Sequence, residues 1–354
     1  MKTPNPNRMF LRYLFTVLFL IIAASLYSQE AGTCAEKLKT AQSLFSKGQV
    51  EQIPSLLKEC MKSGFKKEEE LTAYKLLIQT FLLNDKLEQA DSTMFEFLKN
   101  NPEYQLSPTD HSSFVYLFNS FKVKPVVQIS IHAGTNVPFL TFVVPHLTSG
   151  EQSKSKFTSN IGNLFFSGES RFKVTNKLEL GFEVGFSQMK FNNKINNITG
   201  SAVINYAESQ QRIELPLFAL YNFTSFGKLT LYGRAGFGAA YDLGVTAIAS
   251  SAPTDPANKS SRTGQSLNRK DSRVQIDCFG QLGAGLKYKI SRGFFFVELR
   301  SNLGIFDQNV TGGQTTVPVL DFYYAWHDPD FRLNACNINV GYTYIFYKPS
   351  KRKE

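Results

Sequence analysis

Residues 337–347, NINVGYTYIFY, alternate between two kinds of side chain. One set is large and apolar: Ile338, Val340, Tyr342, Tyr344 and Phe346. The other set is polar or small: Asn337, Asn339, Gly341 and Thr343. Successive side chains of a β-strand point to opposite faces, so a period of two predicts a strand with one apolar face.

The same alternation recurs along the chain from residue 126 onward. VVQISIHAG (126–134), LELGFEVGF (178–186) and RIELPLFALY (212–221) follow it closely, and four further segments follow it less strictly: 162–174, 229–243, 274–290 and 294–303. Short connections at 175–177, 225–228 and 291–293 alternate with long ones at 137–161, 193–206, 249–272 and 304–330. Tight turns at one end and long loops at the other predict an eight-stranded antiparallel transmembrane β-barrel, and its strands are long enough to cross the hydrocarbon layer at a tilt.

A soluble sandwich or a lipocalin-like barrel would also alternate, with its apolar side chains facing inward. Here the minority face carries charges of both signs, interleaved with glycines. This pattern suits a narrow interior filled by ion pairs, because an eight-stranded barrel encloses little more than its own side chains. We therefore expect a closed interior, with a gated channel as the alternative. The residues expected there are Glu169, Arg171, Glu179, Glu183, Arg212, Glu214, Arg234, Asp277, Glu298 and Arg300.

The start of the chain has the features of an export signal. Lys2, Arg8 and Arg12 precede the apolar run YLFTVLFLIIAASL. A basic region followed by a short apolar one predicts a signal peptide over residues 1–28, and an uncleaved anchor helix is the alternative. Export permits disulfides, and Cys34 and Cys60 fall where they could bridge neighbouring helices. Cys278 and Cys336 are expected to face lipid and stay unpaired.

Residues 29–122 have a helical period instead. SKGQVEQIPSLLKECMK (46–62) and LNDKLEQADSTMFEFLK (83–99) can be aligned at a spacing of roughly 37 residues, which indicates two helical hairpins. The pair resembles tetratricopeptide repeats, with Tyr74, Ala90, Phe97 and Pro102 at their customary places and Pro54 as a departure. Stacked helix pairs of this kind commonly bind proteins. The alternative is a small domain that only spaces or caps.

Taken together, the exported helical domain with its two cysteines and NPEY (101–104), followed by IELPLFALYNF (213–223) and LYGRAGFGAAY (231–241), resembles the PorT-like outer-membrane β-barrel proteins of the Bacteroidota. The resemblance covers nearly the whole mature chain. It implies an α+β multidomain protein: a periplasmic helical domain at 29–122, an outer-membrane barrel at 123–348 and a basic periplasmic tail at 349–354. It also implies use as an anchor or accessory subunit.

The sequence offers little for catalysis. Ser130 and His132 in SIHAG are the local candidates for a lipid-modifying enzyme, but an interior histidine satisfied by its neighbours explains the pattern as well. The four histidines lack the spacing of metal ligands, and GRAGFG lies inside a strand, so we expect neither metal nor cofactor. The net charge is +10, and the basic residues are scattered or lie in loops. This distribution argues against nucleic acid as a partner, whereas the positive charge could attract acidic lipid headgroups or peptidoglycan.

Two connections are unusually apolar for loops, at 137–147 and 317–331. Such patches typically mark a partner surface, although both could instead fold over the barrel mouth. The candidate partner-binding residues are Tyr74, Phe139, Phe142, Phe322, Tyr323 and Trp326. The resulting expectation is a non-enzymatic barrel that contacts outer-membrane lipid and anchors a periplasmic protein-binding domain of an envelope machine. The alternative is a lipid-modifying enzyme or a narrow conduit.

Overall fold

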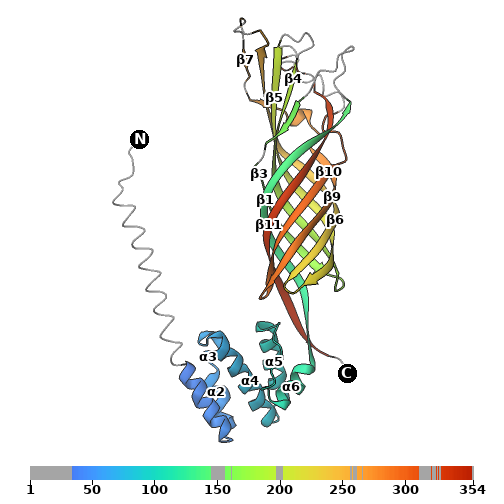
Figure 1. The fold of residues 1–354 in the computed structure, drawn as a ribbon. Coiled ribbons are helices and arrows are strands. Elements are labelled where there is room, and N and C mark those ends of the chain that lie inside the picture. Colours follow the sequence, from blue (N-terminus) through green and yellow to red (C-terminus); the bar gives the residue numbers. More distant parts are fainter. Residues whose placement is uncertain are drawn as a thin grey trace, which may run out of the picture. The chain divides into compact units, whose positions relative to one another are not determined.

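A computed structural model describes residues 34–144, 156–160, 162–196, 202–255, 257, 261–264, 266–310, 320, 324, 326 and 328–352. The predicted signal peptide lies outside these residues. The chain divides into a unit of Met1–Lys124 with Tyr347–Glu354 and a unit of Pro125–Phe346 (Figure 1). Within the described part, no helix is both long and apolar enough to cross a bilayer.

The first unit is helical. Residues 34–46 form a helix, and Gly48 lies in the turn that follows, where its positive φ of 74° suits a residue without a Cβ. The elements that follow are η1 (Val50–Gln52), α2 (Ile53–Leu57), α3 (Cys60–Ser63), α4 (Lys67–Leu83), α5 (Leu87–Asn100) and α6 (Ser112–Asn119). Pro54 lies in the first turn of α2, where its missing N–H costs no hydrogen bond. Cys34 and Cys60 form a disulfide.

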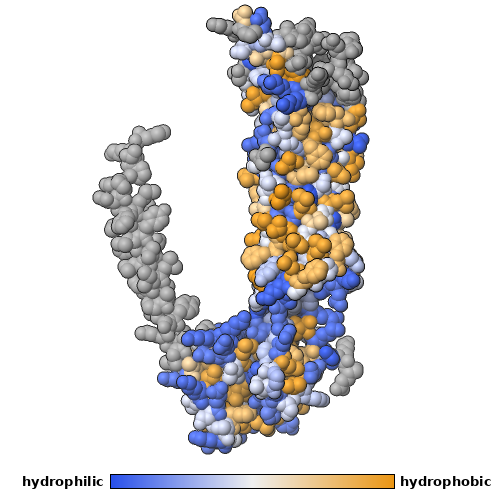
Figure 2. All heavy atoms as spheres, in the orientation of Figure 1, coloured by the Kyte–Doolittle hydropathy of each residue, from blue (hydrophilic) through white to orange (hydrophobic). Residues whose placement is uncertain are grey.

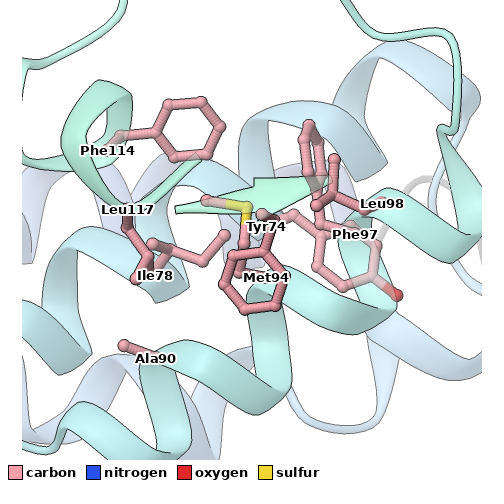
Figure 3. Packing of buried hydrophobic residues seen from close by; sticks show 9 residues of the cluster. Tyr74, Ile78, Ala90, Met94, Phe97, Leu98, Phe114 and Leu117 are labelled. Atoms are coloured by element: carbon pink, nitrogen blue, oxygen red, sulfur yellow. The ribbon is translucent and has the colours of Figure 1, made fainter. Parts of the chain in front are cut away.

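The apolar faces of α4, α5 and α6 meet in one core (Figure 3). Tyr74 lies in this core, and its hydroxyl accepts a hydrogen bond from Asn100 Nδ2 at 2.9 Å. The structure therefore places Tyr74 inside the unit and not on a binding face, because its helical position points it at α5. The buried members of the core are Tyr74, Ile78, Ala90, Met94, Phe97, Leu98, Phe114, Leu117 and Phe121.

The end of the chain also belongs to the helical unit. The Tyr347 hydroxyl donates to Glu103 Oε1 at 2.9 Å, and Lys351 forms an ion pair with Asp91 of α5. The Arg352 N–H donates to the Ser120 carbonyl oxygen at 2.8 Å. Residues 347–352 are thus held against the helices by side-chain and backbone contacts.

A buried polar cluster joins α4 to the segment before α6. Lys75 Nζ lies 2.6 Å from Asp110 Oδ1, and the Tyr104 hydroxyl donates to Asp110 Oδ2 at 2.6 Å. Burial raises the pKa of the Asp110 carboxyl, but hydrogen bonds from Lys75, Tyr104 and the Ser107 N–H outweigh it and hold the pKa below its ordinary value. Asp110 therefore stabilises the fold as a carboxylate.

Asp110→Asn should lower the free energy of unfolding of the helical unit by about 1–2 kcal/mol at neutral pH. A depressed carboxyl pKa stabilises the folded state above the unfolded pKa of about 4, and this contribution is lost as pH falls through the folded pKa. The gap between variant and wild type should therefore close in acid. Urea unfolding of the full chain in detergent, followed by helical circular dichroism at both pH values, measures it. Glu51→Gln, at an exposed site, is the control; an equal loss there would contradict the assignment.

The second unit is built on a closed ring of antiparallel strands (Figure 1), as the sequence predicts. Its order follows the chain, and β1 pairs with β11 to close it. The eight ring strands are β1 (Phe121–Val144), β3 (Asn163–Lys173), β4 (Leu178–Asn196), β5 (Ala202–Phe226), β6 (Leu229–Pro253), β9 (Ile276–Ile290), β10 (Gly293–Gly304) and β11 (Asp330–Lys351). Short strands add to its rim: β2 (Lys156–Ser159), β7 (Arg262–Thr263) and β8 (Leu267–Asn268), with the turn η2 (Lys270–Ser272).

The tight turns lie where the sequence predicts them, but the long connections are shorter than expected. Residues 137–144, 193–196, 202–206 and 249–253 continue the strands, so the predicted loop boundaries there are wrong. The reason is visible in the side chains. Outside the barrel, the apolar series on β4 ends at Phe186, which pairs with Ile213 of β5. Beyond this pair the outward residues of β4 are polar: Gln188, Lys190, Asn192 and Lys194.

The inward face of β4 changes in the opposite sense at the same level. It carries Glu179, Glu183 and Ser187 on the side of the tight turns and mainly apolar residues beyond, as Met189, Phe191 and Ile195 show, whereas the inward residues of β5 opposite them, Gln210 and Glu208, stay polar. We call this switch the polarity inversion. Cys336 is exposed on the barrel's outer face as a free thiol. Between the polarity inversion and the tight turns, exposed apolar residues cover this outer face (Figure 2). They include Ile131, Leu180, Phe182, Val184, Leu215, Leu217, Phe237, Leu282, Val297, Leu299, Ile338 and Val340.

Leu180→Arg should lower the free energy of unfolding of the barrel by about 2–4 kcal/mol, the cost of an arginine that faces the middle of a bilayer. Gln188→Arg, beyond the polarity inversion, should cost about 1 kcal/mol or less. Unfolding from lipid vesicles, followed by the fluorescence of the single tryptophan, measures both. Equal stability of the two variants would mean that the outer face is assigned wrongly.

Candidate functional site

Charged side chains fill the interior of the barrel below the polarity inversion. All ten charged residues expected in the interior are buried: Glu179 is 5% exposed, and each of the other nine is at most 3% exposed. They reach the interior because they occupy the same face of β3, β4, β5, β6, β9 and β10. Buried charges must be paired, since an unpaired ion costs several kcal/mol in such a site. The nine are Glu169, Arg171, Glu183, Arg212, Glu214, Arg234, Asp277, Glu298 and Arg300.

Two arginines hold the centre of this network. Arg300 Nη1 donates to both carboxylate oxygens of Glu183 at 2.9 Å, and Arg300 Nε donates to Glu298. Arg234 Nη1 donates to Glu169 Oε2 at 2.9 Å, and Arg234 also pairs with Glu183. Four strands are thereby cross-linked through the barrel, and the guanidinium groups occupy the space where a lumen would be.

The network continues toward both ends of the barrel. On the side of the tight turns, Lys287 Nζ lies 3.1 Å from Glu179 Oε2, and the Tyr232 hydroxyl donates to Glu298 at 2.7 Å. On the other side, Arg212 bonds to Asp242 at 2.7 Å and to Asp277 at 3.2 Å. Sequence reasoning missed the roles of Lys287, Tyr232 and Asp242. A signal was available for each: Lys287 lies on the same face of β9 as Asp277, and Tyr232 and Asp242 lie on the same face of β6 as Arg234.

Glu214 departs from the prediction of an ion pair. It accepts hydrogen bonds from Ser187 Oγ at 2.5 Å and from Asn302 Nδ2 at 3.2 Å. Within the described part of the chain, no Lys, Arg or His nitrogen lies within the 4.0 Å that defines an ion pair with it. The arginine that precedes it on the same face, Arg212, is turned instead toward two aspartates.

The arrangement agrees with the comparison to known families. Residues 122–308 match the family described as outer membrane protein beta-barrel domain. The chain belongs to this family. No curated protein matches the chain.

Several solved structures of outer-membrane barrels are similar to this barrel protein. The N-terminal β-barrel domain of Pseudomonas aeruginosa OprF is 13% identical, with 62% of this chain and 100% of that chain covered and a TM-score of 0.25. Ail, the attachment invasion locus protein of Yersinia pestis, is 12% identical, with 62% and 99% covered and a TM-score of 0.28. Neisserial surface protein A is 10% identical, with 64% and 99% covered and a TM-score of 0.29.

The barrel interior does not assemble Ser130 and His132 into a catalytic pair. Ser130 Oγ lies 2.7 Å from Thr343 Oγ1 and accepts from Arg171. His132 Nε2 lies 2.6 Å from Ser167 Oγ and 3.4 Å from Glu183. Ser130 is engaged with Thr343 and Arg171, and the Arg300 guanidinium also contacts His132 Nε2, at 3.1 Å, so Ser130 and His132 do not serve one another as nucleophile and base. The residues are also buried, so this histidine is a satisfied member of the network.

The mouth of the barrel is closed by a second cluster. Trp326 stacks on Tyr206 of β5 with ring centroids 4.3 Å apart, and its Nε1 donates to Asp328 at 2.8 Å. Asp328 pairs in turn with Arg273, which also binds Glu208 at 2.6 Å. Trp326 is only 2% exposed, so the structure corrects its assignment to a partner surface. Trp326 and Asp328 lie in the barrel mouth because the indole and the carboxylate find buried partners there.

The remaining partner candidates fare differently. Phe139 and Phe142 lie on β1 and not in a loop, with Phe139 half-buried and Phe142 partly exposed. Phe322 and Tyr323 lie outside the described residues.

Arg300→Ala should lower the free energy of unfolding of the barrel by about 3–5 kcal/mol, because it leaves Glu183 and Glu298 short of compensating charge in a buried site. Arg332→Ala should cost about 1 kcal/mol or less, since its ion pair with Asp307 is exposed to solvent. Trp326 is buried in the barrel mouth, so its fluorescence in a denaturant titration reports unfolding of both variants. If Arg300→Ala lowered the free energy of unfolding no more than Arg332→Ala does, the interior ion pairs would not stabilise the barrel.

Proposed function

We propose that this outer-membrane barrel is a non-enzymatic anchor and that its helical unit, in the periplasm, binds a partner protein of an envelope machine. The observation that carries the proposal is the filled barrel interior. Paired charges occupy the membrane level, and the Trp326 cluster occupies the mouth. An interior committed to its own contacts supports neither a conduit nor a buried active site, so the surfaces that remain for function are external.

Sequence resemblance supports the finer part of the proposal. The signal-peptide pattern at 1–28 and the likeness to PorT-like proteins of the Bacteroidota favour a periplasmic helical unit that serves as an accessory subunit. The likeness of the helical hairpins to tetratricopeptide repeats favours a protein as the ligand. The helical unit is therefore the part expected to recognise the partner.

An exposed apolar site on the helical unit fits this role. Leu83 ends α4 and is 65% exposed, and Leu87 begins α5 and is 58% exposed. We call these two residues and the turn between them the α4–α5 tip. Two leucines exposed together at a helical turn lose no packing when they are replaced, but they provide apolar area to a partner. Phe95, two turns further along the same face of α5, is also exposed and extends the surface.

The tip can be tested with Leu83→Asp/Leu87→Asp in the full-length protein. We expect the partner that co-purifies with the wild type from native outer membranes to be lost, while helical circular dichroism and barrel insertion are unchanged. Tyr116→Asp is the matched control, because Tyr116 is 81% exposed on α6.

Retention of the partner by the tip variant would contradict the α4–α5 tip as its docking site. Loss from the Tyr116→Asp variant alone would move the site to α6. A full-length wild-type protein that remains alone through mild extraction would contradict the anchor proposal itself.

A further inference from the structure

A small cavity lined by several polar residues lies on the outer wall of the barrel, beyond the polarity inversion. Its volume is about 370 Å³, and it is lined by side chains of three adjacent strands, β2, β4 and β5. The strand register arranges them in two rows. Lys156, Lys194 and Asn205 lie directly opposite one another, and Thr158, Asn192 and Ala207 form the next row.

We infer that this cavity binds the phosphorylated, sugar-bearing headgroup of a membrane lipid. Lys156 and Lys194 would hold the phosphate, and Asn192, Asn205 and Thr158 would donate to or accept from sugar hydroxyls. The inference rests on the outer-membrane barrel and not on the partner protein proposed above.

The two lysines are the first reason for an anionic ligand. Cross-strand neighbours have Cβ atoms about 5 Å apart, and like charges at that distance destabilise the pair. Among the described residues, no carboxylate forms an ion pair with Lys156 or Lys194, whereas the buried arginines of the barrel are paired with acids. An anion between the two ammonium groups would remove this repulsion. The repulsion between Lys156 and Lys194 destabilises the cavity, and a bound phosphate would offset it.

The height of the cavity is the second reason. The outward apolar series on β4 ends at Phe186, and Lys190, Asn192 and Lys194 follow on the same face. With a rise of about 3.3 Å per residue and the tilt of barrel strands, Lys190 lies roughly 10 Å and Lys194 roughly 20 Å beyond the apolar belt. The polar layer of a phospholipid leaflet is only about 5–8 Å thick, so the cavity suits a headgroup enlarged by sugars.

The neutral residues complete the match. Asn192 already donates to Asn160 Oδ1 at 3.0 Å, which fixes its amide at the edge of the cavity. Asn205 and Thr158 are exposed, so their polar groups are open to a ligand. Amides and hydroxyls without charge suit hydroxyl-rich rings, while the lysine pair supplies the attraction for phosphate.

The test uses the full-length protein in uncharged detergent and, as the probe, a purified glycolipid whose oligosaccharide headgroup carries phosphate beyond its acylated sugars. We expect Lys156→Gln/Lys194→Gln to weaken binding about 30-fold, as two lysines at a charged lipid surface predict, and added salt to reduce the difference. Lys177→Gln/Lys228→Gln removes the same charge from the tight turns at the other end and should bind as the wild type does. Without lipid, the first variant should be at least as stable as the wild type by Trp326 fluorescence, because it removes the repulsion.

Equal binding by the two double variants would overturn the inference. So would equal binding of the dephosphorylated lipid, which would show that acyl chains alone drive the association. Displacement of the lipid by inorganic phosphate at the same concentration would identify a free-phosphate site instead. None of these outcomes affects the partner bound at the α4–α5 tip, so the two proposals fail separately.

Discussion

A strand in this barrel must match lipid on one face and a narrow closed space on the other. Apolar side chains outside need no partners, but charges inside are removed from water and must satisfy one another. Arg234 and Arg300 meet this demand by reaching across to carboxylates on β3, β4 and β10. Where the strands leave the apolar belt, water replaces lipid outside, and on β4 the outward residues become polar while the inward ones become mainly apolar.

This reversal explains which parts of the fold the sequence could predict. Along 178–186 and 337–347 the two faces differ sharply, so the strands and their faces follow from alternation, and the membrane setting follows once the charges on the minority face and the short and long connections are added. Beyond Phe186 the strand continues with polar residues outside, and a reading that equates polarity with loops ends it too early. On β6 the register to β5 shifts near Leu243, which changes the phase of the alternation and hides the continuation.

For the interior residues, the sequence predicts which face they occupy but not which residues they contact. That a residue such as Glu214 faces inward follows from its parity along β5, but its partners depend on which strands lie across the barrel. Ser187 and Asn302, which bind it, come from β4 and β10, and nothing local in RIELPLFALY indicates them. Trp326 is similar: its burial requires Tyr206, which lies far away in sequence. Register and closure, which no single segment encodes, decide these contacts.

The contrast between paired charges inside the barrel and charges without an ion pair among the described residues outside it favours the outer surface as the place of function. Within the barrel, most of the charged groups offset one another, and a ligand could enter only by breaking several such bonds at several kcal/mol each. Lys156 and Lys194 differ because solvent lowers the cost of leaving them unpaired, yet their register holds them together. Leu83 and Leu87 are the apolar counterpart of these lysines, because both leucines are exposed and neither packs in the core of the helical unit. The interior contributes stability, and both proposals place recognition at surface groups whose interactions within the described residues are incomplete.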